Sequence, residues 1–166
     1  MNMRNTQTNK IMYPLEELLT ISGVQILTGY EGGYVCFISN MDVCTDGSGP
    51  SHGDHYHLDD TAYQPALNAD EDRYIVIPPQ IRMEVDPVVM GCHARLTNLI
   101  TGKWWSAVVG DIGPDEKTGE VAYCLAKLAN RKVTANSGDD REIYLYELWP
   151  GKADTVNGKK YKLQPA

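Results

Sequence analysis

Residues 104–121, WWSAVVGDIGPDEKTGEV, contain an apolar run ending in Asp111, a turn rich in Gly and Pro, and a second acid, Glu120. The apolar run is typical of a buried strand, and Glu120 opens a segment with helical periodicity. In an extended chain this spacing would hold the two acids about 30 Å apart. Because the intervening Gly-Pro and Thr-Gly pairs favour tight turns, we expect the chain to fold back and bring both carboxylates to one cleft.

Two carboxylates facing one cleft can hydrolyse a glycosidic bond by general acid and base catalysis. The same residues also have an ordinary structural interpretation, because Asp is common in loops and Glu is favoured in the first turn of a helix. Spacing alone is weak support for catalysis. The rest of the sequence therefore has to decide between the two interpretations.

Short apolar runs bounded by turn residues recur along the chain and predict β-strands. These strands are expected at residues 34–38, 73–77, 88–96, 104–109 and 143–149, with hairpin turns at Thr101-Gly102-Lys103 and about Asn157-Gly158. An amphipathic helix is expected where one face would carry Val121, Cys124, Leu125, Leu128 and Ala129. A second, short helix is expected at residues 15–19, directly after Pro14.

The balance of these elements predicts a mainly β fold of the α+β class. We expect a small six-stranded β-barrel with one well-defined helix and one or two short peripheral helices. The length of 166 residues suits one domain. We assign that domain to residues 13–166 and interpret residues 1–12 as a flexible N-terminal arm.

The net charge of −7 argues against a nucleic-acid partner, which would need clustered Lys and Arg. A cationic partner fits this charge better. The start of the chain lacks the apolar segment of a secretory signal, and no apolar run is long enough to cross a membrane. We therefore expect a soluble protein that is cytoplasmic at synthesis and has no membrane partner. Extracellular or virion-associated action stays open. The oligomeric state also stays open.

The segment from residue 42 to residue 72 is polar and lacks periodicity, and a loop of this length in a compact domain is usually functional or disordered. Its three histidines, His52, His55 and His57, match no zinc pattern, so we predict neither a metal nor a cofactor. A metal in this loop would order it rather than perform the chemistry. The four cysteines lack CxxC spacing and are interpreted as buried thiols, ahead of disulfides and zinc ligands.

The sequence resembles glycoside hydrolase family 75, the endo-chitosanases, over roughly residues 33–130. The specific part of the resemblance is the pair of motifs VGDIGP at residues 109–114 and TGE at residues 118–120. Supporting similarities lie in MDVCTDG at residues 41–47, in residues 61–79 with their YIVIP ending, and in GCHA at residues 91–94. The tail at residues 142–165 is similar to bacterial and phage-encoded members.

This resemblance implies endo-acting, metal-independent hydrolysis of β-1,4-linked glucosamine polymers with inversion. Asp111 and Glu120 match the catalytic acid and base of the family. Which residue has which role stays open, because a helix N-terminus would favour an ionised Glu120, whereas burial beside aromatic rings would favour its protonated form.

A glucosamine polymer carries ammonium groups, so we expect acidic side chains along the wall that binds it. The candidates for this wall are Asp42, Asp46, Asp59 and Asp60. Tyr63 and Trp105 are candidates for stacking against sugar faces, although Trp105 lies in an apolar run and fits a core position equally well.

Two alternative functions remain open at the level of sequence. One is hydrolysis of another amino-sugar polymer, such as de-N-acetylated peptidoglycan, which the similarity to bacterial and phage-encoded proteins suggests. The other is a noncatalytic glycan-binding or virion-associated module. It is suggested by loop residues Val43-Cys44-Thr45, where the family usually has a further acid, and by the missing signal.

Overall fold

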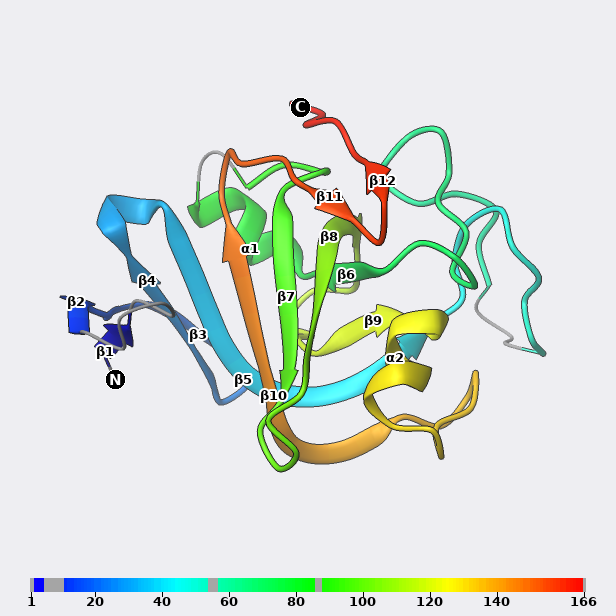
Figure 1. Cartoon of the computed structure of the whole chain (residues 1–166), viewed down its shortest axis with the longest axis horizontal. Helices are drawn as coiled ribbons and strands as arrows, with labels where there is room; N and C mark the ends of the chain where they lie inside the picture. The colour runs from blue at the N-terminus through cyan, green and yellow to red at the C-terminus, as the bar shows by residue number, and fades with distance from the viewer. Residues whose placement is uncertain (1, 5–10, 54–56, 86–87, 166) are drawn as a thin grey trace.

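The computed structural model describes residues 2–4, 11–53, 57–85 and 88–165 (Figure 1). The strands are β1 (Asn2–Arg4), β2 (Ile11–Pro14), β3 (Glu16–Ile21), β4 (Val24–Gly29), β5 (Tyr34–Cys44), β6 (Tyr74–Ile77), β7 (His93–Asn98), β8 (Trp104–Ile112), β9 (Glu120–Ala122), β10 (Asp139–Trp149), β11 (Thr155–Val156) and β12 (Lys159–Lys160). The helices are the 3-10 turn η1 (Tyr30–Gly32), α1 (Pro79–Glu84) and α2 (Tyr123–Ala129).

Six strands close into a barrel in the order β10-β7-β8-β6-β9-β5, and β5 pairs with β10 to complete the ring. Two of the pairings, β5 with β9 and β6 with β8, are parallel, and the others are antiparallel. This result confirms the predicted mainly β fold with a small six-stranded barrel and short helices. Closure leaves the six barrel strands without a free edge.

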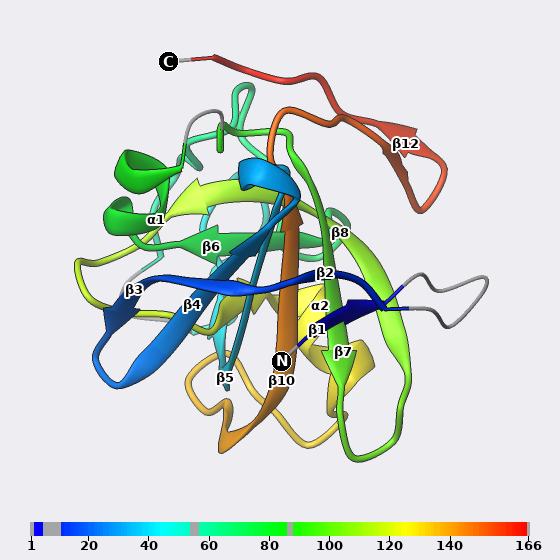
Figure 2. The same cartoon turned by 90° about the vertical axis from the view of Figure 1, so that its left-hand side faces the viewer.

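The longest strands hold the barrel together. β5 pairs with β10 along one edge, while its other edge pairs with β4 near its start and with β9 near its end. β4 and β3 continue from there as a hairpin outside the barrel, which Figures 1 and 2 show projecting from its side. The end of β5 is thus fixed next to the start of β9.

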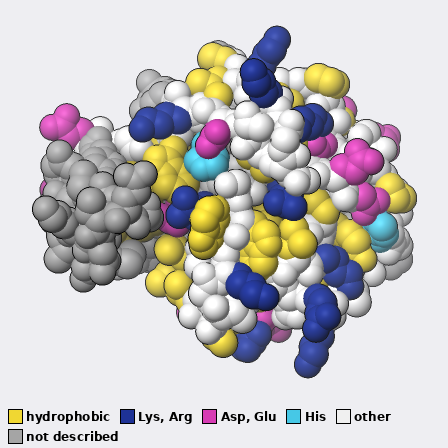
Figure 3. Space-filling model, in the orientation of Figure 1, with side chains coloured by type: hydrophobic (Ala, Val, Ile, Leu, Met, Phe, Trp, Pro, Cys, Tyr) yellow, Lys and Arg dark blue, Asp and Glu magenta, His cyan; other side chains and the backbone are white. Residues whose placement is uncertain are grey.

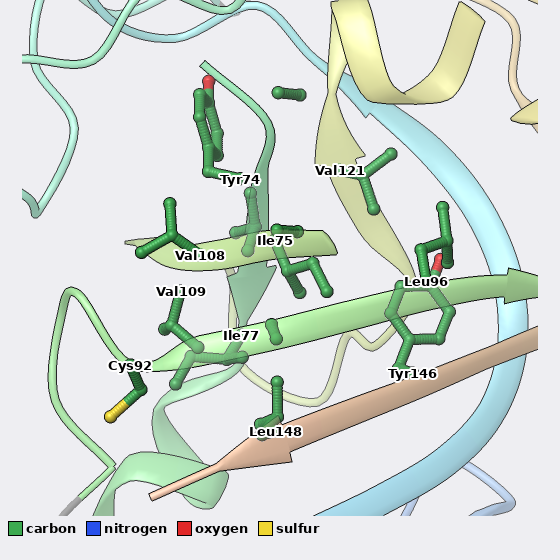
Figure 4. Packing of buried hydrophobic residues seen from close by; sticks show 14 of the residues in the cluster. Tyr74, Ile75, Ile77, Cys92, Leu96, Val108, Val109, Val121, Tyr146 and Leu148 are labelled. Carbon is green, nitrogen blue, oxygen red and sulfur yellow. The ribbon is translucent and has the colours of Figure 1, made fainter. Parts of the chain in front are cut away.

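Buried hydrophobic side chains from several strands pack together in the core (Figure 4). Tyr74, Tyr144 and Tyr146 are the largest of the side chains with almost no exposure, and Tyr146 stacks on Phe37 with ring centroids 4.9 Å apart. The buried hydroxyls are paired: Tyr146 donates to the Asn40 carbonyl at 2.6 Å, and Tyr74 donates to the Asp46 carbonyl at 2.8 Å. Such pairing is what allows a Tyr-rich chain with one Phe to build a core.

Several predicted elements are confirmed. The strands at residues 34–38, 73–77, 104–109 and 143–149 fall within β5, β6, β8 and β10, apart from residue 73, which directly precedes β6. Both hairpin turns lie where they were predicted, between β7 and β8 and between β11 and β12. None of the four cysteines, all within the described residues, forms a disulfide; three are buried and Cys124 is partly buried.

Other predictions need correction. Residues 15–19 form no helix, because Glu16–Ile21 is the first strand of a hairpin that turns at Ser22 and Gly23, both with positive φ. The strand predicted at 88–96 begins only at His93. α2 begins at Tyr123, so Val121 and Glu120 lie on the short strand β9 rather than in the first turn of a helix. β9 is a strand because it pairs with β5 and β6. These partners are distant in sequence, so the local pattern of residues does not predict the pairing.

Parts of the predicted N-terminal arm are paired, since β1 and β2 form an antiparallel ladder. Residues 1 and 5–10 of that arm lie outside the described residues. No helix in the described part of the chain is long and apolar enough to cross a membrane. On the face seen in Figure 3, Lys and Arg side chains are dispersed among hydrophobic and uncharged groups rather than gathered into one patch.

Candidate active site

A row of cross-strand partners carries three carboxylates over four neighbouring strands. Val76 on β6 is the partner of Asp111 on β8 and, on its other side, of Glu120 on β9. Glu120 is in turn the partner of Asp42 on β5. Directly opposed residues project from the same side of a sheet. The row therefore directs Asp111, Glu120 and Asp42 toward one side, with Val76 between the first two.

The register also sets the separation of the two predicted catalytic acids. Asp111 and Glu120 lie two strand spacings apart, which places their Cα atoms about 10 Å from each other. Gly113 packs closely against Val76 and Glu120, because a Cβ there would lie 2.9 Å from Cγ1 of Val76 and 3.3 Å from Oε2 of Glu120. A pair of carboxyls on such a base suits the roughly 6.5–9.5 Å separation that an inverting glycosidase needs for its water.

The turn between β8 and β9 brings the second acid back to the first. Gly119 has φ +84°, and a Cβ there would lie 2.4 Å from the Asn40 carbonyl oxygen. Its own carbonyl accepts a hydrogen bond from the Asp42 backbone N–H at 2.6 Å. Only glycine fits this close approach at positive φ, so the Thr-Gly pair fixes where Glu120 begins its strand.

Asp111 is held firmly by one of its two oxygens. Oδ1 accepts hydrogen bonds from the backbone N–H groups of Ala62 and Ile112, both at 2.9 Å. The residue is 7% exposed, and the Asp46 carboxyl lies beside it. Burial raises the pKa of Asp111 to about 7 against the effect of the two backbone N–H groups, and Asp46 adds to the rise. Near neutral pH this carboxyl therefore holds a proton for part of the time.

Glu120 has a different environment. Burial raises the pKa of Glu120 above its usual value, although the Lys117 ammonium, whose Nζ lies 3.8 Å from Oε2, opposes the rise. The same ammonium lies 3.2 Å from Oδ2 of Asp42. The two candidate catalytic acids thus share burial but differ in their neighbours: a carboxyl stands beside Asp111 and a cation beside Glu120.

The row lies at the base of an open cleft with a volume of about 1110 Å³. One wall comes from residues 42–44, from Asp46, and from His57 and Leu58 of the long loop, and the other from residues 135–138 between α2 and β10. The loop is pinned at this position, since Asp46 Oδ1 accepts the Leu58 backbone N–H at 2.9 Å. The residues that line the cleft are Asp42, Val43, Cys44, Asp46, His57, Leu58, Val76, Asp111, Ile112, Gly113, Pro114, Lys117, Glu120, Ala135, Asn136, Ser137 and Gly138.

Of the residues predicted to bind substrate, Asp42 and Asp46 line the cleft together with the two predicted catalytic acids. Asp59 and Asp60 are exposed on the loop just beyond Leu58 but do not line it. The interpretation of these two as part of the cleft wall needs correction: they lie between Leu58, which lines the cleft, and Ala62, which hydrogen-bonds to Asp111, but they do not belong to the lining themselves.

The two aromatic residues predicted to stack against sugars lie elsewhere. Tyr63 is buried, its ring packs edge-on against Tyr161 and its hydroxyl accepts the Lys162 backbone N–H at 3.1 Å. Trp105 is partly buried against the barrel core and does not line the cleft. Both side chains pack against other residues of the protein, as aromatic side chains usually do.

Lys117 is the main residue that sequence reasoning missed. It lies within the turn that joins the two acids, but a lone Lys in a polar turn gives no sequence signal that it faces a carboxylate three residues later. Asn136 and Ser137, on the far wall, were missed for another reason: they are far from the acids in sequence and reach the cleft only through barrel closure.

A metal centre is not the best interpretation of the groups near Asp111. Cys44, Asp46 and Asp111 bring potential ligand atoms within 4.8 Å of one another. Metals bind the thiolate and carboxylate forms, yet burial raises the pKa of both Cys44 and Asp111. We therefore interpret this cluster as the neighbourhood of a protonated acid.

The described histidines of the loop do not converge on a metal site either. His52 pairs with Asp70 at 2.6 Å and stacks on the Tyr123 ring, while Nδ1 of His57 lies 2.5 Å from the Thr45 carbonyl. His55 lies outside the described residues.

A scan against protein-family models finds no family that matches this sequence, and a search of curated proteins finds no match. The geometry of the cleft therefore has to carry the functional argument.

Proposed function

We propose that this protein is an endo-acting glycoside hydrolase that cleaves β-1,4-linked glucosamine polymers with inversion, using Asp111 and Glu120. The observation that carries the proposal is the cross-strand row in which Val76 separates these two acids at the base of an open cleft. A separation of two strand spacings suits a mechanism in which a water molecule and a glycosidic bond lie between two carboxyls of unlike environment. The resemblance of the VGDIGP and TGE motifs to endo-chitosanases supports the same reaction.

The different environments of the two acids favour different roles for them. Asp111, with its pKa raised to about 7, retains a proton to give to the leaving oxygen and is the general acid. Glu120, with an ammonium beside it, is the carboxylate that takes a proton from the attacking water on the opposite face of the sugar. The rate should therefore fall on the acidic side as Glu120 is protonated and on the alkaline side, near pH 7, as Asp111 ionises.

The charge of the cleft favours a cationic polymer. Asp42, Asp46, Asp111 and Glu120 line it, against one Lys or Arg among the described lining residues, and the whole chain carries −7. Such a field attracts the ammonium groups of glucosamine units at long range and raises their local concentration. An open cleft rather than a closed pocket suits attack within a long chain.

The experiment measures new reducing ends released from chitosans of graded acetylation and from de-N-acetylated peptidoglycan. Wild type should cleave the polymers rich in free amines, and Asp111→Asn and Glu120→Gln should each lower the rate by a factor of about 100 or more. The matched control is Asp115→Asn, an exposed acid in the same turn, which should keep wild-type activity. Full activity in Asp111→Asn or Glu120→Gln would refute the mechanism, and binding without new reducing ends would indicate a noncatalytic module.

A further inference from the structure

Lys117 lies on an exposed turn but directs its ammonium into the cleft. Its Nζ lies 3.2 Å from Oδ2 of Asp42 and 3.8 Å from Oε2 of Glu120. Burial alone would lower the pKa of Lys117, but Glu120 and Asp42 outweigh it and raise the pKa, so the ammonium stays charged. A charged group therefore bridges two carboxylates of the cross-strand row.

The turn that carries Lys117 is fixed from two sides. The Glu116 carbonyl accepts a hydrogen bond from the Ser22 hydroxyl at 2.8 Å, and the Glu116 backbone N–H donates to Oε1 of Gln80 at 3.3 Å. Glu116 itself has φ +60°. The neighbouring β3–β4 turn and α1 thus hold the backbone next to Lys117, and its placement does not depend on the carboxylates alone.

Among the other groups around Glu120, Asp46 and Asp42 favour its protonated form, and a hydrogen bond with Cys44 opposes them. Lys117 is the only Lys or Arg among the described residues that line the cleft. The remaining titratable groups near Glu120 are Asp42 and Cys44 on β5, Asp46 and His57 on the loop, Asp111 on β8 and Tyr146 on β10. Without Lys117, this collection of acids and buried hydroxyl or thiol groups would leave the carboxylate of Glu120 without an opposite charge.

We propose that Lys117 is a positioning residue that keeps Glu120 ionised and aims its carboxylate at the attacking water, with Asp42 anchoring the ammonium from the other side. This inference rests on the proposed function, since it explains how two buried acids in one cleft hold opposite protonation states. Lys117 contacts Glu120 and Asp42 and has no recorded ion pair with Asp111. It follows that Asp42 acts through Lys117 rather than as a free carboxylate for a substrate ammonium.

The first measurement is direct titration of the Glu120 carboxyl by NMR in protein labelled with ¹³C at glutamate, and it needs no substrate. Lys117→Met should raise the pKa of Glu120 by about 1, because it removes an opposite charge within contact distance. Lys117→Arg should keep the pKa near that of wild type. Lys160→Met, which removes an exposed cation on β12 away from the cleft, is the matched control and should change nothing. An unchanged Glu120 pKa in Lys117→Met, or an equal rise in Lys117→Arg, would overturn the proposal.

The second measurement is the pH profile of kcat/KM on the polymer that wild type cleaves. The acidic limb should move to higher pH in Lys117→Met by the same amount as the Glu120 pKa, and Lys117→Arg should restore it. A Glu120 pKa that moves while the limb stays would overturn the role of Lys117 in catalysis. If wild type cleaves no polymer, the proposed function fails, and the NMR titration still decides whether Lys117 holds Glu120 ionised.

Discussion

Ionisation of Asp111 is less favourable in the folded chain than in the unfolded chain. Its carboxyl is buried beside a second carboxyl, and two backbone N–H groups on one oxygen only partly offset that environment. The pKa of about 7 in the folded chain compares with 3.8 for the free side chain. Between these values the folded state binds more protons than the unfolded state, so stability falls as pH rises from about 4 to about 7.

Asp111→Asn should remove this pH dependence. The amide oxygen can still accept from Ala62 and Ile112, and the amide nitrogen can donate toward Asp46. At pH 4 the melting temperature of the variant should be close to that of wild type. At pH 8 it should be a few degrees higher, because the buried carboxyl of wild type must ionise there. Thermal melts across this range check the prediction, with Asp115→Asn as control. A difference between Asp111→Asn and wild type that does not change with pH would contradict it.

At the scale of single residues, the sequence identifies the catalytic candidates but not the side chains that surround them. Asp111 and Glu120 are recognisable because their motifs are local. Tyr63 and Trp105 are misjudged because an aromatic ring suits a sugar face and a protein core equally well, and only packing distinguishes the two. The role of Lys117 is not predicted, because its contacts depend on the conformation of an irregular turn, which has no periodic sequence pattern.

The β8–β9 turn is the element on which the site depends most. Gly119 allows β9 to start beside β5, since any side chain there would meet the backbone oxygen and the side chain of Asn40. The hydrogen bond from Asp42 to the Gly119 carbonyl ties the turn to the cross-strand row. A local change at Gly119 should therefore displace Glu120 relative to Asp111.

Gly119→Ala should destabilise the protein by about 2 kcal/mol or more, because it combines strain at positive φ with a steric overlap. Activity should fall together with stability, as Glu120 shifts. Gly102→Ala is the matched control: Gly102 also has positive φ, +74°, but a Cβ there meets nothing within 4 Å. Chemical denaturation measures the free energy of unfolding of both variants. Gly102→Ala reports the cost of positive φ alone, and Gly119→Ala adds the steric overlap with Asn40. Equal losses of stability in the two variants would show that the overlap with Asn40 costs nothing.

Elements with a strong local pattern are predictable from this sequence, and elements fixed by distant partners are not. β6 and β8 are apolar runs bounded by turns, and the Asn157-Gly158 hairpin carries its own turn signal. β9 has three residues, and its apolar positions fit the face of the following helix equally well. Its strand conformation comes from pairing with β5 and β6, whose positions depend on closure of the whole barrel.

At the scale of the whole molecule, barrel closure converts a dispersed set of acids into one negatively charged cleft. Asp42 and Asp46 precede Asp111 by more than sixty residues in the sequence. The barrel nevertheless places all of them around one opening, in a chain of net charge −7. A polycation approaching this opening is attracted before it makes contact.

This attraction should weaken with salt. As ionic strength rises from about 0.01 M to about 1 M, the screening length falls from about 30 Å to about 3 Å. KM for a soluble glucosamine polymer should therefore rise several-fold, while kcat changes much less, because the buried acids are poorly screened. Steady-state kinetics over this range test the prediction. A KM independent of salt would mean that the negative cleft does not recruit the polymer by charge.

The stereochemistry of the first product tests the central claim most directly. Asp111 and Glu120 lie two strands apart, on either side of Val76, and in the proposed mechanism a water molecule attacks between them, so the reaction should invert the anomeric centre. ¹H NMR of a glucosamine oligosaccharide during the first minutes of cleavage should show the α-anomer accumulating before mutarotation. Initial accumulation of the β-anomer would require the two carboxyls to act at the shorter separation of a retaining enzyme, and would contradict this account.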